Sequence, residues 1–256
     1  MHPLKRPGPR TGPVPGNSLP WLRARRDSTA PSGFPRGSPP ATHSKGDPLN
    51  LKAETPDRPL HLSPFLVDAP NLATLSGLAA GFGALGLAVQ ERFGPALCLA
   101  LLAILIDQLD GRLALNRPER SPAVRAFGAH LDCYADFVSK GVFPALMLVI
   151  LGDFAWWNWL VGGLHLAAIA VRYSYEFVPS APRRGLSPDY SILVFGLLYL
   201  ASPGWGDHYP RALAAAMVGL AALNLAPFSV PKLKGLGMGA FIAFALGLMA
   251  LLIGRP

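Results

Sequence analysis

Long apolar runs separated by short polar breaks make up the chain from residue 65 onward. An α-helix needs about 20 mostly apolar residues to cross the hydrocarbon core of a bilayer. Overall, 51% of the 256 residues are hydrophobic and 15% are charged, whereas about 25% of residues are charged in soluble domains. The pattern therefore predicts an all-α, polytopic membrane helix bundle over residues 65–256, with six to seven transmembrane helices. The expected helices span about 71–90, 95–115, 128–151, 154–175, 188–202, 210–228 and 236–253.

Residues 1–64 have a different composition, rich in Pro, Gly, Ser and Arg and without a continuous apolar run. Such a segment cannot bury enough surface to offset the entropy of ordering it. We therefore expect a disordered, basic, Pro-rich tail, which either contacts anionic lipid or is simply solvated. The net charge of +8 suits a membrane surface better than nucleic acid, because the positive residues lie mainly in this tail and in short loops.

The basic loops also predict an orientation. If the tail is cytoplasmic, the loops on the same side contain most of the positive residues, as the positive-inside rule requires. These residues are Arg117, Arg120, Arg125, Arg183, Arg184, Lys232 and Lys234. The sequence thus predicts a multi-pass integral membrane protein.

Four aspartates lie inside apolar segments, as the pairs Asp107 and Asp110, and Asp132 and Asp136. Each carboxylate costs about 2.5–3.5 kcal/mol at the centre of a membrane helix. Such a cluster needs compensation, and divalent cations are the natural partners of a ligand set made only of oxygens. We therefore expect Mg²⁺ or Mn²⁺, singly or as a pair, bound by these four residues.

The spacing places the acidic residues on helix faces that can converge. Asp107, Asp110, Gly111 and Ala114 share one face, because residues three and four apart are neighbours on a helix. Gly128, Asp132 and Asp136 step by four and share a second face. With the predicted orientation, both acidic pairs lie at the cytoplasmic side. An ion or solute carrier that uses the carboxylates as a relay is the alternative from another functional class.

The spacing also resembles a known family. Asp107-Gln-Leu-Asp110-Gly111-Arg-Leu-Ala114 followed by Gly128-x-x-x-Asp132-x-x-x-Asp136 resembles the signature of the CDP-alcohol phosphatidyltransferases. Pro70-Asn71-Leu-Ala-Thr74 resembles the opening of the family's first helix, and the stretch from Phe127 to Ala145 is similar to the bacterial phosphatidylserine synthases.

The resemblance implies a metal-dependent enzyme of phospholipid biosynthesis. It would transfer the phosphatidyl group from CDP-diacylglycerol to an alcohol, with L-serine as the expected acceptor and inositol or glycerol 3-phosphate as alternatives. Asp136 is the implied catalytic base and also a metal ligand. The active site would face the cytoplasm, with a bacterial inner membrane as the expected location. Homodimers are usual in the family, so the resemblance also allows a homodimer.

The resemblance further implies residues that bind the substrates. They are Asn71, Thr74, Gly111, Ala114, Gly128 and Arg172. The sequence departs from the family pattern in three places. Leu115 replaces an arginine, twelve residues (116–127) separate the two parts of the signature instead of eight, and Lys140 replaces an aromatic residue. Arg117, Arg120 or Arg125 could supply the lost charge, Lys140 could pair with Asp136 in competition with metal, and a degenerate enzyme stays an alternative.

Overall fold

The computed structural model describes residues 61–179, 185–228, 230 and 235–254. Every regular element in these ranges is a helix, so the predicted all-α class is confirmed. A short helix α1 (Ser63–Leu66) precedes the bundle. The long elements are α2 (Ala69–Val89), α3 (Phe93–Leu115), α4 (Pro122–Asp136) continuing into α5 (Phe143–Leu151), α6 (Trp156–Glu176), α7 (Asp189–Ala201), α8 (Tyr209–Leu225) and α9 (Leu236–Ile253).

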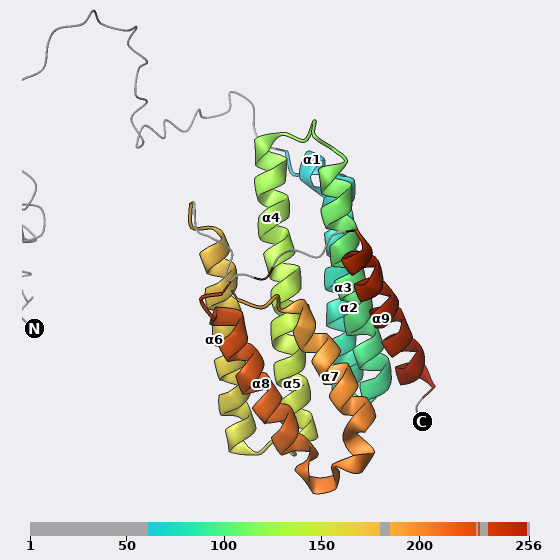
Figure 1. The fold of residues 1–256 in the computed structure, drawn as a ribbon. Helices are drawn as coiled ribbons and strands as arrows, with labels where there is room; N and C mark the ends of the chain where they lie inside the picture. Colours follow the sequence, from blue (N-terminus) through green and yellow to red (C-terminus); the bar gives the residue numbers. More distant parts are fainter. Residues whose placement is uncertain (1–60, 180–184, 229, 231–234, 255–256) are drawn as a thin grey trace, which may run out of the picture. The chain divides into compact units, whose positions relative to one another are not determined.

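The continuous segment α4–α5 runs through the middle of this bundle (Figure 1). Helices α6 and α8 pack together on one side of it, and α2, α3 and α9 pack on the other, with α7 between α3, α8 and α9. The buried core joins large side chains from several of these helices. They include Leu97, Leu101 and Ile104 of α3, Phe143, Met147 and Leu148 of α5, and Ile192 and Phe195 of α7.

Four helical segments are long and apolar enough to cross a membrane, judged by length and composition alone. They are Ala69–Val89, Phe93–Leu115, Pro122–Leu151 and Leu236–Ile253. Helices α7 and α8 have 13 and 17 residues, which is shorter than the roughly 20 residues of a full span.

The central segment begins at Pro122, whereas the sequence analysis placed its start at residue 128, which was wrong. Ser121 caps the helix, because its hydroxyl accepts a hydrogen bond from the Val124 N–H at 3.3 Å, and Pro122 has the backbone dihedral that a first helical turn needs. The loop after α3 therefore contains only residues 116–121.

A π-helical turn, η2 (Phe137–Val142), interrupts the central segment directly after Asp136. Pro144 explains this local irregularity, because a proline has no N–H and its ring clashes with the carbonyl of the residue four positions earlier, here Lys140. The Lys140 carbonyl instead accepts a hydrogen bond from Nε2 of the fully buried His165 in α6, at 3.1 Å. Since π turns rotate the residues within them relative to an α-helix, this turn sets the direction of the Lys140 side chain.

The predicted tail, residues 1–64, lies outside the described residues as far as residue 60, and so do Arg183, Arg184, Lys232 and Lys234. The predictions of a disordered tail and of a basic cytoplasmic face therefore stay predictions at these positions.

Candidate active site

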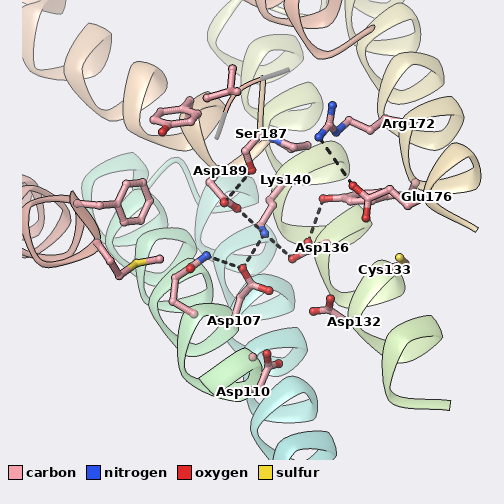
Figure 2. A pocket seen from close by; sticks show the side chains of 18 of the residues that line it. Asp107, Asp110, Asp132, Cys133, Asp136, Lys140, Arg172, Glu176, Ser187 and Asp189 are labelled. Carbon is pink, nitrogen blue, oxygen red and sulfur yellow. Dashed lines mark hydrogen bonds and ion pairs between the residues drawn. The ribbon is translucent and has the colours of Figure 1, made fainter. Parts of the chain in front are cut away.

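One pocket of about 610 Å³ opens between α3, α4, α6, the start of α7 and the start of α9. Its walls combine acidic, basic and apolar side chains (Figure 2). The acidic and basic side chains of the wall are Asp107, Asp110, Arg112, Asp132, Asp136, Lys140, Arg172, Glu176 and Asp189.

Three of the four predicted aspartates meet in this pocket. Asp107 of α3 and Asp132 and Asp136 of α4 each offer an oxygen, and these oxygens lie within 4.8 Å of one another. The convergence follows from their spacing, because the short loop 116–121 makes α3 and α4 consecutive helices whose acidic faces turn toward each other.

Asp110 lies beside this group and lines the same pocket. Its side chain is buried, with 6% of the residue exposed, and its Oδ2 accepts a hydrogen bond from the Thr74 hydroxyl at 2.5 Å. Thr74 of α2 therefore contacts the acidic group through Asp110.

Lys140 is the cation of the cluster. Its Nζ lies 3.0 Å from Asp107 Oδ2, 2.7 Å from Asp136 Oδ1 and 2.5 Å from Asp189 Oδ1, and only 2% of the residue is exposed. The pairing with Asp136 agrees with the sequence analysis. The contacts with Asp107 and Asp189 link the central segment to α3 and to the start of α7 (Figure 2).

Asp189 is a member of the cluster that was not predicted from the sequence. This residue is the first of α7, a position that favours acidic side chains because of the helix dipole, and its Oδ2 accepts a hydrogen bond from the Ser187 hydroxyl at 2.9 Å. A lysine inside an apolar segment is itself a signal that further carboxylates lie nearby, but the signal does not say on which helix.

Tyr173 of α6 was also missed. Its hydroxyl donates to Asp136 Oδ2 at 3.0 Å, while Lys140 contacts the other oxygen of Asp136. The carboxylate predicted to act as a base is thus held at both oxygens, by two side chains from different elements.

Asn71 and Gly128 lie in a second polar cluster, outside the lining of the pocket. Asn71 is 1% exposed; its amide donates to the Phe65 carbonyl at 2.8 Å and accepts from Arg120 Nη2 at 2.9 Å. Arg120 also pairs with Asp68 at 2.7 Å. A side chain at Gly128 would meet Asn71 Oδ1 at 2.6 Å, so the glycine lets α4 approach this cluster.

Of the other predicted substrate-binding residues, some line the pocket and one does not. Gly111 and Arg172 line the pocket, whereas Ala114 does not. Arg172 Nη1 donates to the Asn224 carbonyl at 3.0 Å, and its Nη2 lies 3.8 Å from Glu176. The family resemblance leads one to expect an arginine at position 115, where this chain has a leucine. Arg112, one turn earlier in α3, lines the pocket, and it was not among the substitutes proposed from the sequence.

The donor set fits a divalent cation. All ligand atoms in the group of Asp107, Asp132 and Asp136 are carboxylate oxygens, which is the chemistry that Mg²⁺ and Mn²⁺ prefer. Asp132 Oδ1 is buried and has no hydrogen-bond partner among the described residues. Six carboxylates and only three basic side chains among the described residues line the pocket, so the site retains excess negative charge for a cation to neutralise.

Comparisons with known proteins point to one family. Over 172 residues, 66% of this chain and 71% of the relative, it is 27% identical to an archaetidylserine synthase of Methanothermobacter thermautotrophicus. It is 28% identical over 155 residues to the CDP-diacylglycerol–serine O-phosphatidyltransferases of Mycobacterium bovis and Mycobacterium tuberculosis, covering 53% of this chain. The chain spans about half (51%) of the length of these mycobacterial relatives.

The family model for CDP-alcohol phosphatidyltransferases matches residues 67–244. This range contains all four aspartates of the signature, the Lys140 contacts and the whole pocket wall. With four helices long and apolar enough to cross a membrane, the chain is an integral membrane protein and belongs to the CDP-alcohol phosphatidyltransferase family.

Proposed function

We propose that this protein transfers the phosphatidyl group of CDP-diacylglycerol to L-serine, forming phosphatidylserine and releasing CMP. The observation that carries the proposal is the group of three carboxylates within 4.8 Å of one another, on the wall of a pocket that also contains basic side chains. The family match and the activities for which the relatives are named support the same chemistry.

The reaction exchanges one phosphorus–oxygen bond for another. The serine hydroxyl attacks the phosphorus that bears diacylglycerol, the bond from this phosphorus to CMP breaks, and the hydroxyl proton goes to Asp136. Asp136 suits the role of base because Tyr173 and Lys140 fix both of its oxygens, and a base must be held in position to act.

Asp107, Asp110 and Asp132 would hold a divalent cation together with Asp136. A bound Mg²⁺ or Mn²⁺ would neutralise charge on the pyrophosphate oxygens and on the departing CMP. Gly111 leaves space at the pocket wall, because no atom lies within 4 Å of where its side chain would project. We assign this space to the substrate's phosphates.

The wall formed by α6 supports an amino-acid acceptor. Arg172 presents a guanidinium that can pair with a carboxylate, and Glu176, one turn further along, is an acidic side chain that can accept hydrogen bonds from an ammonium group. A zwitterion such as serine has a carboxylate for Arg172 and an ammonium group for Glu176, whereas inositol and glycerol 3-phosphate have no ammonium group.

We also propose that the pocket faces the cytoplasm. Asp107 and Asp110 lie in the last part of α3, which leads into the loop 116–121 with Arg117 and Arg120. Basic loops of this kind favour the cytoplasmic side, and the nucleotide of CDP-diacylglycerol is found there.

The test is an acceptor screen with the purified protein in detergent, CDP-diacylglycerol and Mg²⁺. The rate of CMP release should be much higher with serine than with inositol or glycerol 3-phosphate, and Arg172→Gln should raise the KM for serine. Asp153→Asn, in the exposed turn between α5 and α6, is the matched control and should behave as the unaltered protein. Faster release with inositol or glycerol 3-phosphate would overturn serine as acceptor. No release with any alcohol, together with ion flux in proteoliposomes, would favour a carrier.

A further inference from the structure

We propose that the ammonium group of Lys140 takes the place of a second divalent cation, so that the pocket binds one divalent ion and not two. The inference rests on the metal-dependent transfer proposed above. It concerns a residue that replaces an aromatic of the resembled family and therefore belongs to this chain's own chemistry.

The position of the ammonium group is the first argument. In two-metal sites, carboxylates bridge ions that lie about 3.5–4 Å apart. Lys140 Nζ bridges Asp107 and Asp136, at 3.0 and 2.7 Å, and these two residues belong to the group whose oxygens lie within 4.8 Å of one another. An ion that bridged the same two oxygens would have to displace the ammonium group.

Lys140 is fixed in this position. It is 2% exposed, and it lies in the π turn that Pro144 imposes. His165 of α6 holds its carbonyl at 3.1 Å. The His165 contact holds the backbone and the three carboxylates hold the ammonium group, so an ion at this position would have to break these contacts.

Asp189 explains how an ammonium group can stay next to a divalent cation. The two positive charges repel each other, and a further carboxylate on the far side of the ammonium group offsets this repulsion. Asp189 Oδ1 lies 2.5 Å from Lys140 Nζ, while Ser187 holds the other oxygen of Asp189. In Figure 2, Asp189 approaches Lys140 from the side opposite Asp132.

The remaining side of the cluster has room for one ion. Asp132 and Asp110 make no contact with Lys140 in Figure 2, Asp132 Oδ1 has no hydrogen-bond partner among the described residues, and Thr74 orients Asp110. The carboxylates of Asp107, Asp132 and Asp136, which each offer an oxygen within 4.8 Å of the others, form a single cation position, and Asp110 lies beside it on the same pocket wall.

The experiment counts Mn²⁺ ions in the purified full chain, without CDP-lipid, by equilibrium dialysis and electron paramagnetic resonance. The unaltered protein should bind one Mn²⁺ with an uncoupled spectrum. Lys140→Met should bind two, with the spin coupling of ions about 4 Å apart, and Lys140→Arg should bind one. The double variant Asp107→Asn/Asp132→Asn should bind no Mn²⁺ at this site. Any Mn²⁺ that still binds to this double variant lies elsewhere on the protein, and its amount is subtracted from the other counts.

Two coupled Mn²⁺ ions in the unaltered protein would overturn the proposal, and so would a single ion in folded Lys140→Met. If Lys140→Met does not fold, the count for the unaltered protein decides alone, with one ion supporting the proposal and two contradicting it. Because ion counting uses no lipid substrate, its outcome is independent of whether any alcohol releases CMP.

A double-mutant cycle tests the part assigned to Asp189. Asp189→Asn should weaken Mn²⁺ binding about tenfold or more in the unaltered background and have a much smaller effect in Lys140→Met, because Asp189 acts through the ammonium group. Equal effects in both backgrounds would contradict this role.

Discussion

Two buried polar clusters lie within this apolar bundle, and their charges are balanced differently. Near the start of α2, one carboxylate, Asp68, meets one guanidinium, Arg120, and the amide of Asn71 completes the contacts. In the pocket, six carboxylates face three basic side chains, and the ammonium group of Lys140 contacts three of these carboxylates. A balanced cluster holds helices together, whereas a cluster with excess negative charge is prepared to receive a cation.

The largest expected effect is on turnover at the unbalanced cluster. Asp136→Asn should lower the rate of CMP release by about 100- to 10,000-fold, the usual contribution of a general base. Binding of CDP-diacylglycerol should change little, because the other aspartates remain. Steady-state kinetics and lipid-binding measurements in detergent check both quantities. A loss of binding as large as the loss of turnover would argue against a dedicated base.

At the balanced cluster the expected effect is on stability. Arg120→Met leaves Asp68 buried without its ion pair, and breaking a buried pair costs about 3–5 kcal/mol. The apparent free energy of unfolding in detergent should fall by this amount, while the turnover of the folded fraction should change little. A large loss of turnover without loss of stability would place Arg120 in the chemistry, as the substitute for the arginine missing at Leu115.

Packing against the same cluster gives a smaller effect. Gly128→Ala would place a methyl group 2.6 Å from Asn71 Oδ1 and 2.9 Å from Arg120 Nη2, and such overpacking costs about 1–3 kcal/mol. Gly86→Ala in α2 is the matched control, because no atom lies within 4 Å of the added methyl group. Thermal unfolding should separate the two variants. Equal unfolding temperatures of the two variants would contradict the close contact between α4 and α2 at Gly128.

The smallest expected effect concerns Tyr173. Tyr173→Phe removes the hydrogen bond to Asp136 Oδ2, and hydrogen bonds to charged groups contribute about 1.5–3 kcal/mol. We expect turnover to fall about tenfold, with little change in the KM for serine, because the substitution disturbs the base and not the acceptor. An unchanged rate would show that Lys140 alone positions Asp136.

The sequence predicts the part of the site that depends on local geometry. Asp107 and Asp110, and Asp132 and Asp136, share helix faces by spacing alone, and the short loop 116–121 connects the two helices, both of which pack against α2. Asp189 and Tyr173 could not be predicted in the same way, because their contacts join residues 37 or more positions apart and depend on how α6 and α7 pack.

Two further points needed the structure. The family resemblance implied substrate contacts for Asn71 and Gly128, and the structure places both against Arg120 in the balanced cluster. Lys140 was expected to pair with Asp136 because the two are one turn apart. Its reach to Asp107 depends on the π turn, and a periodicity of 3.6 residues does not foresee that turn.

The metal dependence of phosphatidylserine formation tests most directly whether the carboxylate cluster acts through a bound cation. Purified protein is stripped with a chelator, supplied with CDP-diacylglycerol and labelled serine, and titrated with Mg²⁺. We expect no labelled lipid before Mg²⁺ is added, a saturable rise with Mg²⁺, and no activity of Asp132→Asn at the same Mg²⁺ concentrations. Labelled lipid formed in the presence of chelator, or full activity of Asp132→Asn, would contradict a cation-dependent role of the cluster.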